Sequence, residues 1–416
     1  MMNMEHKRVV ITGYGAITPL GNSAEESWQS IMDYQTGYRY VDKTDAGVNA
    51  KFYGLIDNEP KLKGVPASIR RKLPRFARLG LAAAQEAVTM AFNHSQPNDL
   101  YDPLRCGVIL GTGWGGLDDA NQNYDDYKQA GVGSPFSCFH CMPSIATAAC
   151  SLLWGLRGYQ NTPIAACATG SIAIGDAYEL IKNGKMSMML AGGSESLLSD
   201  ESVWMIDVLQ ALSHEQQDIH KASCPFSLDR SGFVLSEGAA ILCLEERESA
   251  LSRGATILGE IKGYGSFSDA FDFTAPAQDK LSRISTIKKA ISDSGLTLSE
   301  IGYINAHGTS TMLNDLNETE SIKNAFGHHA YKVPISSTKS YSGHLIAAAG
   351  SFESIICLKA LENNILPATL NLNNPDPDCD LDFIPNQHLH TVVDNVLNLS
   401  FGFGGTNAAL IIGRSL

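Results

Sequence analysis

The sequence predicts an α/β protein with mixed sheets. Short apolar segments rich in β-branched residues alternate with longer alanine-rich segments along most of the chain. This alternation is typical of helices that cover buried strands. The chain has 416 residues, of which 44% are hydrophobic, and this is enough for a sizeable core and for two to three domains. No Pro- or Ser-rich linker interrupts the chain, so we expect its parts to pack together as one unit.

The individual elements follow from composition, length and flanking glycines. The expected strands are residues 8–12, 106–110, 188–191, 239–244, 257–264, 303–306 and 408–412. The expected helices are residues 76–91, 171–183, 281–294, 316–326 and 347–363.

A weak internal duplication divides the chain into two similar parts. Residues 106–113 and 301–308 each form an apolar segment that ends in glycine, and a second strand-to-helix turn follows each of them. The identities are too few to prove a repeat. We therefore expect an N-terminal half, residues 1–254, and a C-terminal half, residues 255–416, with a site between them.

Charge and cysteine content exclude several classes of function. The net charge of −13 argues against a nucleic-acid partner. No run of residues approaches the ~18 apolar positions of a membrane span, and Gly13 and Gly15 break the only N-terminal segment that resembles a signal peptide. An odd number of cysteines, nine, indicates a reducing compartment, and we expect a cytoplasmic protein without disulfides. Cys138 and Cys141 lack a second ligand pair, so we expect no metal site.

Cys167 is the strongest candidate for a reactive residue. It lies in the segment PIAACATGS, between an apolar stretch and a helix start built from small residues. A helix N-terminus and nearby imidazoles lower the pKa of a thiol, and the thiolate is the nucleophile. Two downstream histidines, His307 in NAHGTST and His344 in STKSYSGHLIAAAG, each lie beside a glycine among small or hydroxyl residues. Together they indicate acyl transfer through a thioester.

These segments resemble the elongating β-ketoacyl-acyl-carrier-protein synthases, close to synthase II. The resemblance covers nearly the whole chain and includes residues 9–19, 230–239, 366–375 and 401–407. It implies a thiolase-like fold of two pseudo-repeated halves in five layers, α-β-α-β-α. It also implies decarboxylative Claisen condensation of a cysteine-bound acyl group with malonyl-acyl carrier protein. No cofactor is implied, because both substrates are carried on the phosphopantetheine of an acyl carrier protein.

The resemblance also assigns roles to single residues. Cys167 holds the acyl chain, and His307 and His344 donate hydrogen bonds to the malonyl thioester carbonyl and stabilise the enolate. Lys339 is expected to be a buried cation that tunes the histidines. Asp315 and Glu353 match acidic positions of the supporting network.

Two further parts of the site are implied. The glycine-rich segment 402–407 is expected to supply an oxyanion-hole N–H at Phe403, beside the N–H of Cys167, and the Phe403 ring matches the gating aromatic. Trp114 and Ile206 are expected to line the acyl pocket. Trp114 replaces a smaller aliphatic residue, so we expect it to narrow this pocket and favour short or planar acyl chains.

A basic segment is the candidate docking surface. Residues 61–78 hold seven Lys or Arg and no acid, in contrast with the acidic whole. Such a run is often only a solvated helix face, but the resemblance favours docking of the acidic carrier through Arg70, Arg71, Lys72 and Arg75.

Other readings remain open. A coenzyme A-dependent thiolase would carry a second cysteine near the C-terminus, and residues 401–407 have none. An initiating synthase would have asparagine in place of His344, and a non-catalytic chain-length-factor subunit would lack Cys167. Fatty-acid elongation and a specialised polyketide or aryl-polyene pathway are not separated by the sequence. We expect a homodimer, or a heterodimer with a homologous subunit.

Overall fold

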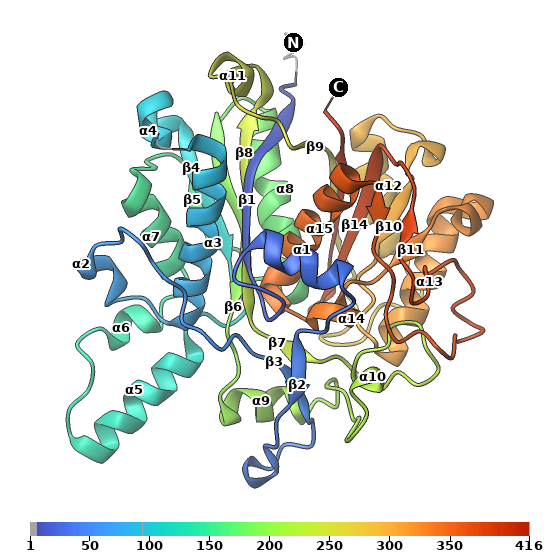
Figure 1. Cartoon of the computed structure of the whole chain (residues 1–416), viewed down its shortest axis with the longest axis horizontal. Coiled ribbons are helices and arrows are strands. Elements are labelled where there is room, and N and C mark those ends of the chain that lie inside the picture. Colours follow the sequence, from blue (N-terminus) through green and yellow to red (C-terminus); the bar gives the residue numbers. More distant parts are fainter. Residues whose placement is uncertain (1–5, 94, 416) are drawn as a thin grey trace.

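The structure, a computed structural model, describes residues 6–93 and 95–415. Its centre is one ten-stranded sheet made of two five-stranded halves (Figure 1). The strands of the first half are, in spatial order, β5 (Gln160–Asn161), β4 (Cys106–Gly111), β6 (Met188–Glu195), β8 (Gly238–Glu246) and β1 (Val9–Ile17). Those of the second half are β11 (Ile335–Ser336), β10 (Tyr303–Asn305), β14 (Asn395–Gly402), β15 (Thr406–Gly413) and β9 (Gly259–Ser268).

The two halves have the same strand pairing. In the first half β4 runs parallel to β5 and β6, and β6, β8 and β1 then pair antiparallel. In the second half β10 runs parallel to β11 and β14, and β14, β15 and β9 pair antiparallel. A short antiparallel pairing of β1 with β9 joins the halves. The pseudo-repeat expected from the sequence is thus confirmed in the topology.

Helices form the other three layers. The central layer consists of α8 (Thr169–Lys182) and α15 (Ala349–Asn363), which contact each other and strands of both half-sheets. On the outer face of the first half lie α3 (Arg75–Phe92) and α7 (Ile145–Trp154). The helices α12 (Leu281–Ser294) and α13 (Met312–Phe326) lie on the outer face of the second half. The five-layer α-β-α-β-α prediction is confirmed (Figure 1).

The remaining elements are shorter or more peripheral. The helices are α1 (Ala24–Met32), α2 (Ala67–Arg70), α4 (Pro97–Leu100), α5 (Leu117–Ala130), α6 (Ser137–His140), α9 (Asp200–Asp207), α10 (Ile219–Ala222), α11 (Arg247–Ser252) and α14 (Lys339–Ser342). The strands are β2 (Tyr38–Tyr40), β3 (Phe52–Gly54), β7 (Leu235–Ser236), β12 (Ile365–Leu366) and β13 (Leu389–His390). Within the described residues, no helix combines the length and the apolar character required to cross a bilayer.

Small residues allow the central helices to approach each other at their starts. A Cβ on Gly350 would lie 2.2 Å from the Ser171 hydroxyl, and one on Gly170 would lie 2.8 Å from the carbonyl oxygen of Ala347. A larger side chain at either position would push the helices apart. Because Cys167 precedes α8 and His344 precedes α15, this close approach brings the two predicted reactive residues together.

Candidate active site

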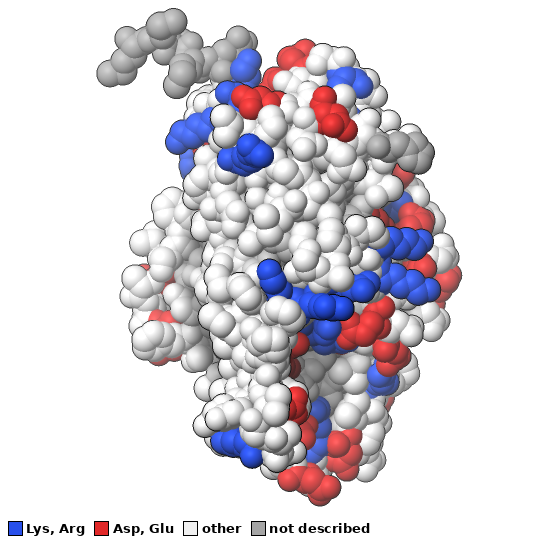
Figure 2. Space-filling model, turned by 90° about the vertical axis from the view of Figure 1, so that its left-hand side faces the viewer, with Lys and Arg blue, Asp and Glu red and all other residues white. Residues whose placement is uncertain are grey.

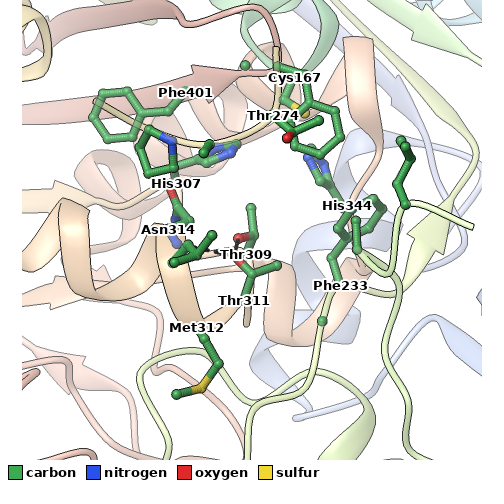
Figure 3. Close-up of a pocket in the computed structure, with 18 of the residues that line it drawn as sticks. Cys167, Phe233, Thr274, His307, Thr309, Thr311, Met312, Asn314, His344 and Phe401 are labelled. Atoms are coloured by element: carbon green, nitrogen blue, oxygen red, sulfur yellow. Dashed lines mark hydrogen bonds between the residues drawn. The ribbon is translucent and has the colours of Figure 1, made fainter. Parts of the chain in front are cut away.

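Cys167, His307 and His344 meet in one buried cluster, as the sequence predicted. Cys167 lies in the 3-10 turn Ala166–Ala168 that leads into α8. His307 follows β10, and His344 lies between α14 and the start of α15. The cysteine sulfur and one ring nitrogen of each histidine all lie within 4.8 Å of one another. Figure 3 shows Cys167 facing the two imidazole rings, whose centroids are 5.5 Å apart.

The three side chains line a cavity of about 270 Å³. Aromatic and hydroxyl side chains complete its wall (Figure 3). They include Phe233, Thr274, Thr309, Thr311, Phe401 and Phe403. The Thr309 and Thr311 hydroxyls lie 2.9 Å apart and form a hydrogen bond to each other. The mixture of an apolar wall with a few polar groups is typical of a pocket for a small organic group.

The hydrogen bonds of His344 fix its tautomer. The backbone N–H of Ile346 donates to His344 Nδ1 over 3.1 Å, so Nδ1 is an acceptor and the neutral ring carries its proton on Nε2. This Nε2 is buried and has no protein partner in the described residues. Burial, followed by the charge of Lys339, holds the pKa of His344 well below its usual range. The ring is therefore a neutral hydrogen-bond donor with an unused N–H.

His307 reaches the same state by a different route. The Lys339 ammonium lies 3.3 Å from His307 Nδ1, which makes Nδ1 the acceptor and leaves the proton on Nε2. Burial is the largest cause of the strongly lowered pKa of His307, and the charges of Lys339, His344 and Arg283 add to it. Lys339 itself forms a buried ion pair with Glu353, whose pKa burial raises to about 7. Both residues thus lie where the sequence predicted a supporting network.

The protonation state of Cys167 differs from the sequence prediction of a lowered thiol pKa. Burial raises the pKa of Cys167 to about 11, although the Lys339 charge and the backbone N–H groups of Phe403 and Cys167 act in the opposite direction. The helix start does not compensate for the loss of water around the sulfur. The free enzyme therefore holds a neutral thiol. The Phe403 and Cys167 N–H groups nonetheless point to the region of the sulfur, where an oxyanion of a bound thioester would form.

Asp315 lies farther from the reactive groups than the other supporting residues. It is fully buried on α13, accepts the N–H of Phe226 over 2.9 Å, and lies 3.8 Å from the Arg230 guanidinium. Arg230 also pairs with Asp376 at 2.7 Å. Asp315 therefore stabilises the loops that surround the cavity and makes no hydrogen bond to either histidine in the described contacts.

The two predicted acyl-pocket residues do not line this cavity. The backbone N–H groups of Gly113 and Trp114 lie 2.6 and 3.5 Å from the buried Glu195 carboxylate, and the Trp114 side chain is 40% exposed. Ile206 is buried in an apolar cluster with Phe233 and other residues. The narrowing of an acyl channel by Trp114 stays a prediction.

The predicted docking residues are of two kinds. Arg70 and Arg71 are exposed, at the end of α2 and just beyond it, and Lys72 places its ammonium 5.2 Å from the Phe139 ring. Arg75 is instead bonded to Glu237 and Glu59, each at 2.7 Å. Arg70, Arg71 and Lys72 are consequently the stronger docking candidates. Figure 2 shows one face of the molecule, with Lys and Arg side chains gathered across its middle beside acidic side chains.

Two residues of the site were missed by the sequence analysis. Glu318 is fully buried and accepts the backbone N–H groups of His307 and Gly308 at 2.7 and 2.8 Å, so it fixes the loop that carries His307. Its spacing of three residues from Asp315 on one helix face was an available signal. The second is Arg283 on α12, which lines the cavity and resembles an ordinary basic helix residue in the sequence.

Comparison with known proteins agrees with this geometry. Residues 6–250 match the family "Beta-ketoacyl synthase, N-terminal domain", and residues 258–373 match "Beta-ketoacyl synthase, C-terminal domain". The chain is 40% identical to 3-oxoacyl-[acyl-carrier-protein] synthase 2 of Synechocystis sp. over 99% of both chains. It is 38% identical to the protein of the same name from Coxiella burnetii, again over 99% of both.

Solved structures give the same picture. A β-ketoacyl synthase from Burkholderia phymatum has a TM-score of 0.90 at 33% identity and covers 99% of this chain and 100% of its own. A type II polyketide ketosynthase bound to its acyl carrier protein and a hexaketide, AntDE:AntF, has a TM-score of 0.89 at 33% identity, with the same coverage. The ishigamide ketosynthase/chain length factor has a TM-score of 0.87 at 31% identity, again with this coverage.

Proposed function

The chain belongs to the β-ketoacyl synthase family, and from this premise we propose that it catalyses the decarboxylative condensation of an acyl group on Cys167 with malonyl-acyl carrier protein. The product is 3-oxoacyl-acyl carrier protein. The observation that carries this proposal is the buried cavity in which one thiol faces two neutral imidazoles. Of these imidazoles, His344 has a buried Nε2 without a protein partner.

The first half-reaction loads the enzyme. The Cys167 sulfur attacks the thioester carbonyl of an acyl carrier, the bond to the carrier sulfur breaks, and the thiol proton passes to the departing sulfur. The N–H groups of Cys167 and Phe403 stabilise the tetrahedral oxyanion. Because the proton leaves with the carrier thiol, the raised pKa of Cys167 is compatible with this step, which needs no permanent thiolate.

The second half-reaction forms the new carbon–carbon bond. The Nε2–H groups of His307 and His344 donate to the malonyl thioester oxygen, where negative charge develops as carbon dioxide leaves. The carbon–carboxylate bond supplies the electron pair of the enolate, which attacks the acyl carbonyl on Cys167. The bond to the Cys167 sulfur then breaks, and the thiolate takes a proton from water. The neutral imidazoles can fill this role because each ring carries its one proton on Nε2 and donates from that atom.

Substrates arrive on the phosphopantetheine of an acidic carrier protein that docks on Arg70, Arg71 and Lys72, and no metal or other cofactor takes part. The protein acts in the cytoplasm, and the nine free cysteines are compatible with such a reducing compartment. The protein acts as a dimer of two copies of this chain. A heterodimer with a homologous second subunit is the alternative assembly.

Fatty-acid-type elongation is the pathway we favour. The curated relatives named synthase 2 are 35–40% identical over nearly the full chain. The type II polyketide ketosynthase AntDE:AntF is 33% identical, and the ishigamide ketosynthase/chain length factor is 31% identical. A specialised polyketide or aryl-polyene pathway is the second candidate, and the exposed, bulky Trp114 is the feature that favours it.

Separating the half-reactions tests the proposal. The variants His307→Ala and His344→Ala should still load an acyl group on Cys167 but lose most carbon dioxide release from malonyl carrier, each by about 100-fold, the cost typical of one oxyanion donor. Radiolabelled carbon dioxide release and acyl loading are measured in parallel. Normal decarboxylation by both variants would remove the histidines from the mechanism.

A further inference from the structure

Arg283 places a buried positive charge in the wall of the active-site cavity. It lies on the first turn of α12, is 6% exposed, and lines the same cavity as Cys167 and His307. Its guanidinium carbon lies 4.2 Å from the centre of the Phe401 ring, and that ring is 5.9 Å from the ring of His307. The cation is thus separated from the reacting groups by about one side chain.

This guanidinium has no ion-pair partner within 4 Å in the described residues. Among the described residues, its one hydrogen bond runs from a terminal nitrogen to Asn314 Oδ1 over 3.1 Å, and its buried Nε has no partner there. Burial lowers the pKa of Arg283 to about 10, against the raising effect of Glu318, Asp269 and Asp315. A buried cation normally requires a close anion. Arg283 therefore lacks the anionic partner that its burial requires.

The three neighbouring carboxylates are already engaged elsewhere. Glu318 holds the His307 and Gly308 N–H groups, and Asp315 holds Phe226 N–H and faces Arg230. Asp269 accepts the Asn407 amide over 2.7 Å. None of them forms an ion pair with Arg283, and the Arg283 side chain lines the cavity that the malonyl group of the proposed reaction would enter.

We propose that Arg283 is the binding residue for the carboxylate of the malonyl group. This inference rests on the proposed function, because it assigns the recognition of the second substrate to a residue of the same cavity. His307 and His344 hold the thioester oxygen, and the malonyl carboxylate lies two carbons away from that carbonyl carbon. Asn314, the partner of Arg283, lies on the His307 side of the cavity (Figure 3). The carboxylate is thereby directed to the cation and away from the acyl group on Cys167.

The charge acts on affinity and selectivity, and it does not accelerate bond cleavage. A guanidinium that contacts the carboxylate stabilises the bound substrate, and this interaction weakens as the carboxylate becomes neutral carbon dioxide. An interaction made in the ground state and lost in the transition state lowers KM without raising kcat. Arg283 therefore lets the enzyme choose malonyl carrier over acyl carriers in the second half-reaction.

Steady-state kinetics of Arg283→Gln tests this inference. Glutamine keeps a donor for Asn314 but removes the charge, so KM for malonyl carrier should rise about tenfold or more, the range for hydrogen bonds to charged groups. The kcat should stay equal or rise. The rate of Cys167 loading from an acyl carrier, whose acyl group has no carboxylate, should not change. Arg283→Lys, which keeps the charge without the planar fork, should give an intermediate KM.

Controls separate this inference from folding and from the proposed function. Lys288→Gln removes a charge from an exposed position of the same helix and should leave KM unchanged. Normal loading of Cys167 in Arg283→Gln shows that the variant is folded. If wild type condenses malonyl carrier and Arg283→Gln has the same KM, or loses kcat alone, the assignment of Arg283 is overturned. Failure of wild type to condense at all would instead overturn the proposed function.

Discussion

At the scale of single residues, the two histidines have the same protonation state for different reasons. A backbone N–H, that of Ile346, sets the tautomer of His344, whereas the ammonium of Lys339 sets that of His307. The backbone N–H of residue 346 is kept by every substitution except proline, whereas the ammonium of Lys339 is lost in any substitution by an uncharged residue. His307 is therefore the histidine whose state depends on a neighbouring side chain.

The thiol of Cys167 should react slowly with alkylating reagents at neutral pH. With a pKa of about 11, the thiolate fraction grows about tenfold per pH unit below that value, so the alkylation rate should rise about 100-fold from pH 7 to pH 9. The Lys339 charge lowers the pKa of Cys167. Lys339→Met should therefore raise this pKa and slow alkylation at a given pH. Peptide mass spectrometry after iodoacetamide pulses resolves Cys167 from the exposed Cys138 and Cys141.

A matched control is Lys288→Met, which removes an exposed lysine far along the chain from Lys339 and should not change the rate. A rate at Cys167 that is already independent of pH at pH 7 would contradict the neutral thiol.

Sequence reasoning identified the reactive residues because their neighbours are unusual. Glycines and other small residues surround Cys167, His307 and His344 in the sequence, and such a composition is unusual for an ordinary strand or helix. Glu318 and Arg283 lie in ordinary helical segments, and their burial is a product of tertiary packing that no local pattern reveals. The same holds for the pKa of Cys167, since the desolvation that raises it comes from segments distant in the sequence.

At the scale of elements, the strands and helices with strong periodicity were predicted well. All seven expected strands and all five expected helices are present, with ends shifted by a few residues. The strand β14 was missed because asparagine and serine interrupt its apolar pattern, and Asn398 and Ser400 hydrogen-bond to α15 and α8 across the layers. The helix α5 was missed because it buries no residue and so lacks an apolar face.

The ion pair of Lys339 and Glu353 links α14 to α15 and should be essential for stability. Both side chains are 2% exposed. Removing one partner leaves a buried charge, so Glu353→Leu should lower the free energy of unfolding by about 3–5 kcal/mol. The double variant Lys339→Met/Glu353→Leu removes both charges and should recover most of this loss. Urea denaturation followed by circular dichroism gives both values.

The pair serves the site as well as the fold. The double variant should be folded yet condense poorly, because His307 then lacks the donor at Nδ1. A single Glu353→Leu variant as stable as wild type would show that the pair contributes nothing to the connection between α14 and α15.

At the scale of the whole molecule, one face has the uncharged and partly apolar character of a surface that is covered by another chain. Much of the face in Figure 2 carries no charged side chain, and the edge strand β5 lies on this side of the molecule. Large apolar side chains near β5 in the chain are solvent-exposed in the single chain, with exposed fractions of 71% for Leu152 and 60% for Ile164. An unpaired strand edge bordered by apolar side chains is typical of a surface that another chain covers.

We expect the isolated protein to sediment as a dimer. Leu152→Glu combined with Ile164→Glu should convert it to a monomer at micromolar concentration, because the introduced charges would have to be buried without partners. Leu251→Glu, at an exposed position of α11 in the same half, is the control and should remain dimeric. A wild-type protein that sediments as a monomer would contradict the homodimer and leave the heterodimer to be tested with a homologous subunit.

The basic surface at the end of α2 should govern carrier affinity. Arg70→Glu with Arg71→Glu should raise KM for the acyl carrier, because the acidic carrier would then be repelled. Added salt should weaken wild-type affinity, because it screens the attraction between opposite charges. The control Lys288→Glu reverses an exposed charge on α12. If wild type and the double variant have equal KM values and salt has no effect, these residues form only a solvated helix face and do not dock the carrier.

The central claim is that Cys167 carries the acyl group during condensation. The most direct measurement is mass spectrometry of the digested protein after incubation with an acyl carrier. We expect the acyl mass on the peptide that contains Cys167, its disappearance when malonyl carrier is added, and no condensation by Cys167→Ala. Acylation at another cysteine, with Cys167→Ala still forming 3-oxoacyl product, would contradict it.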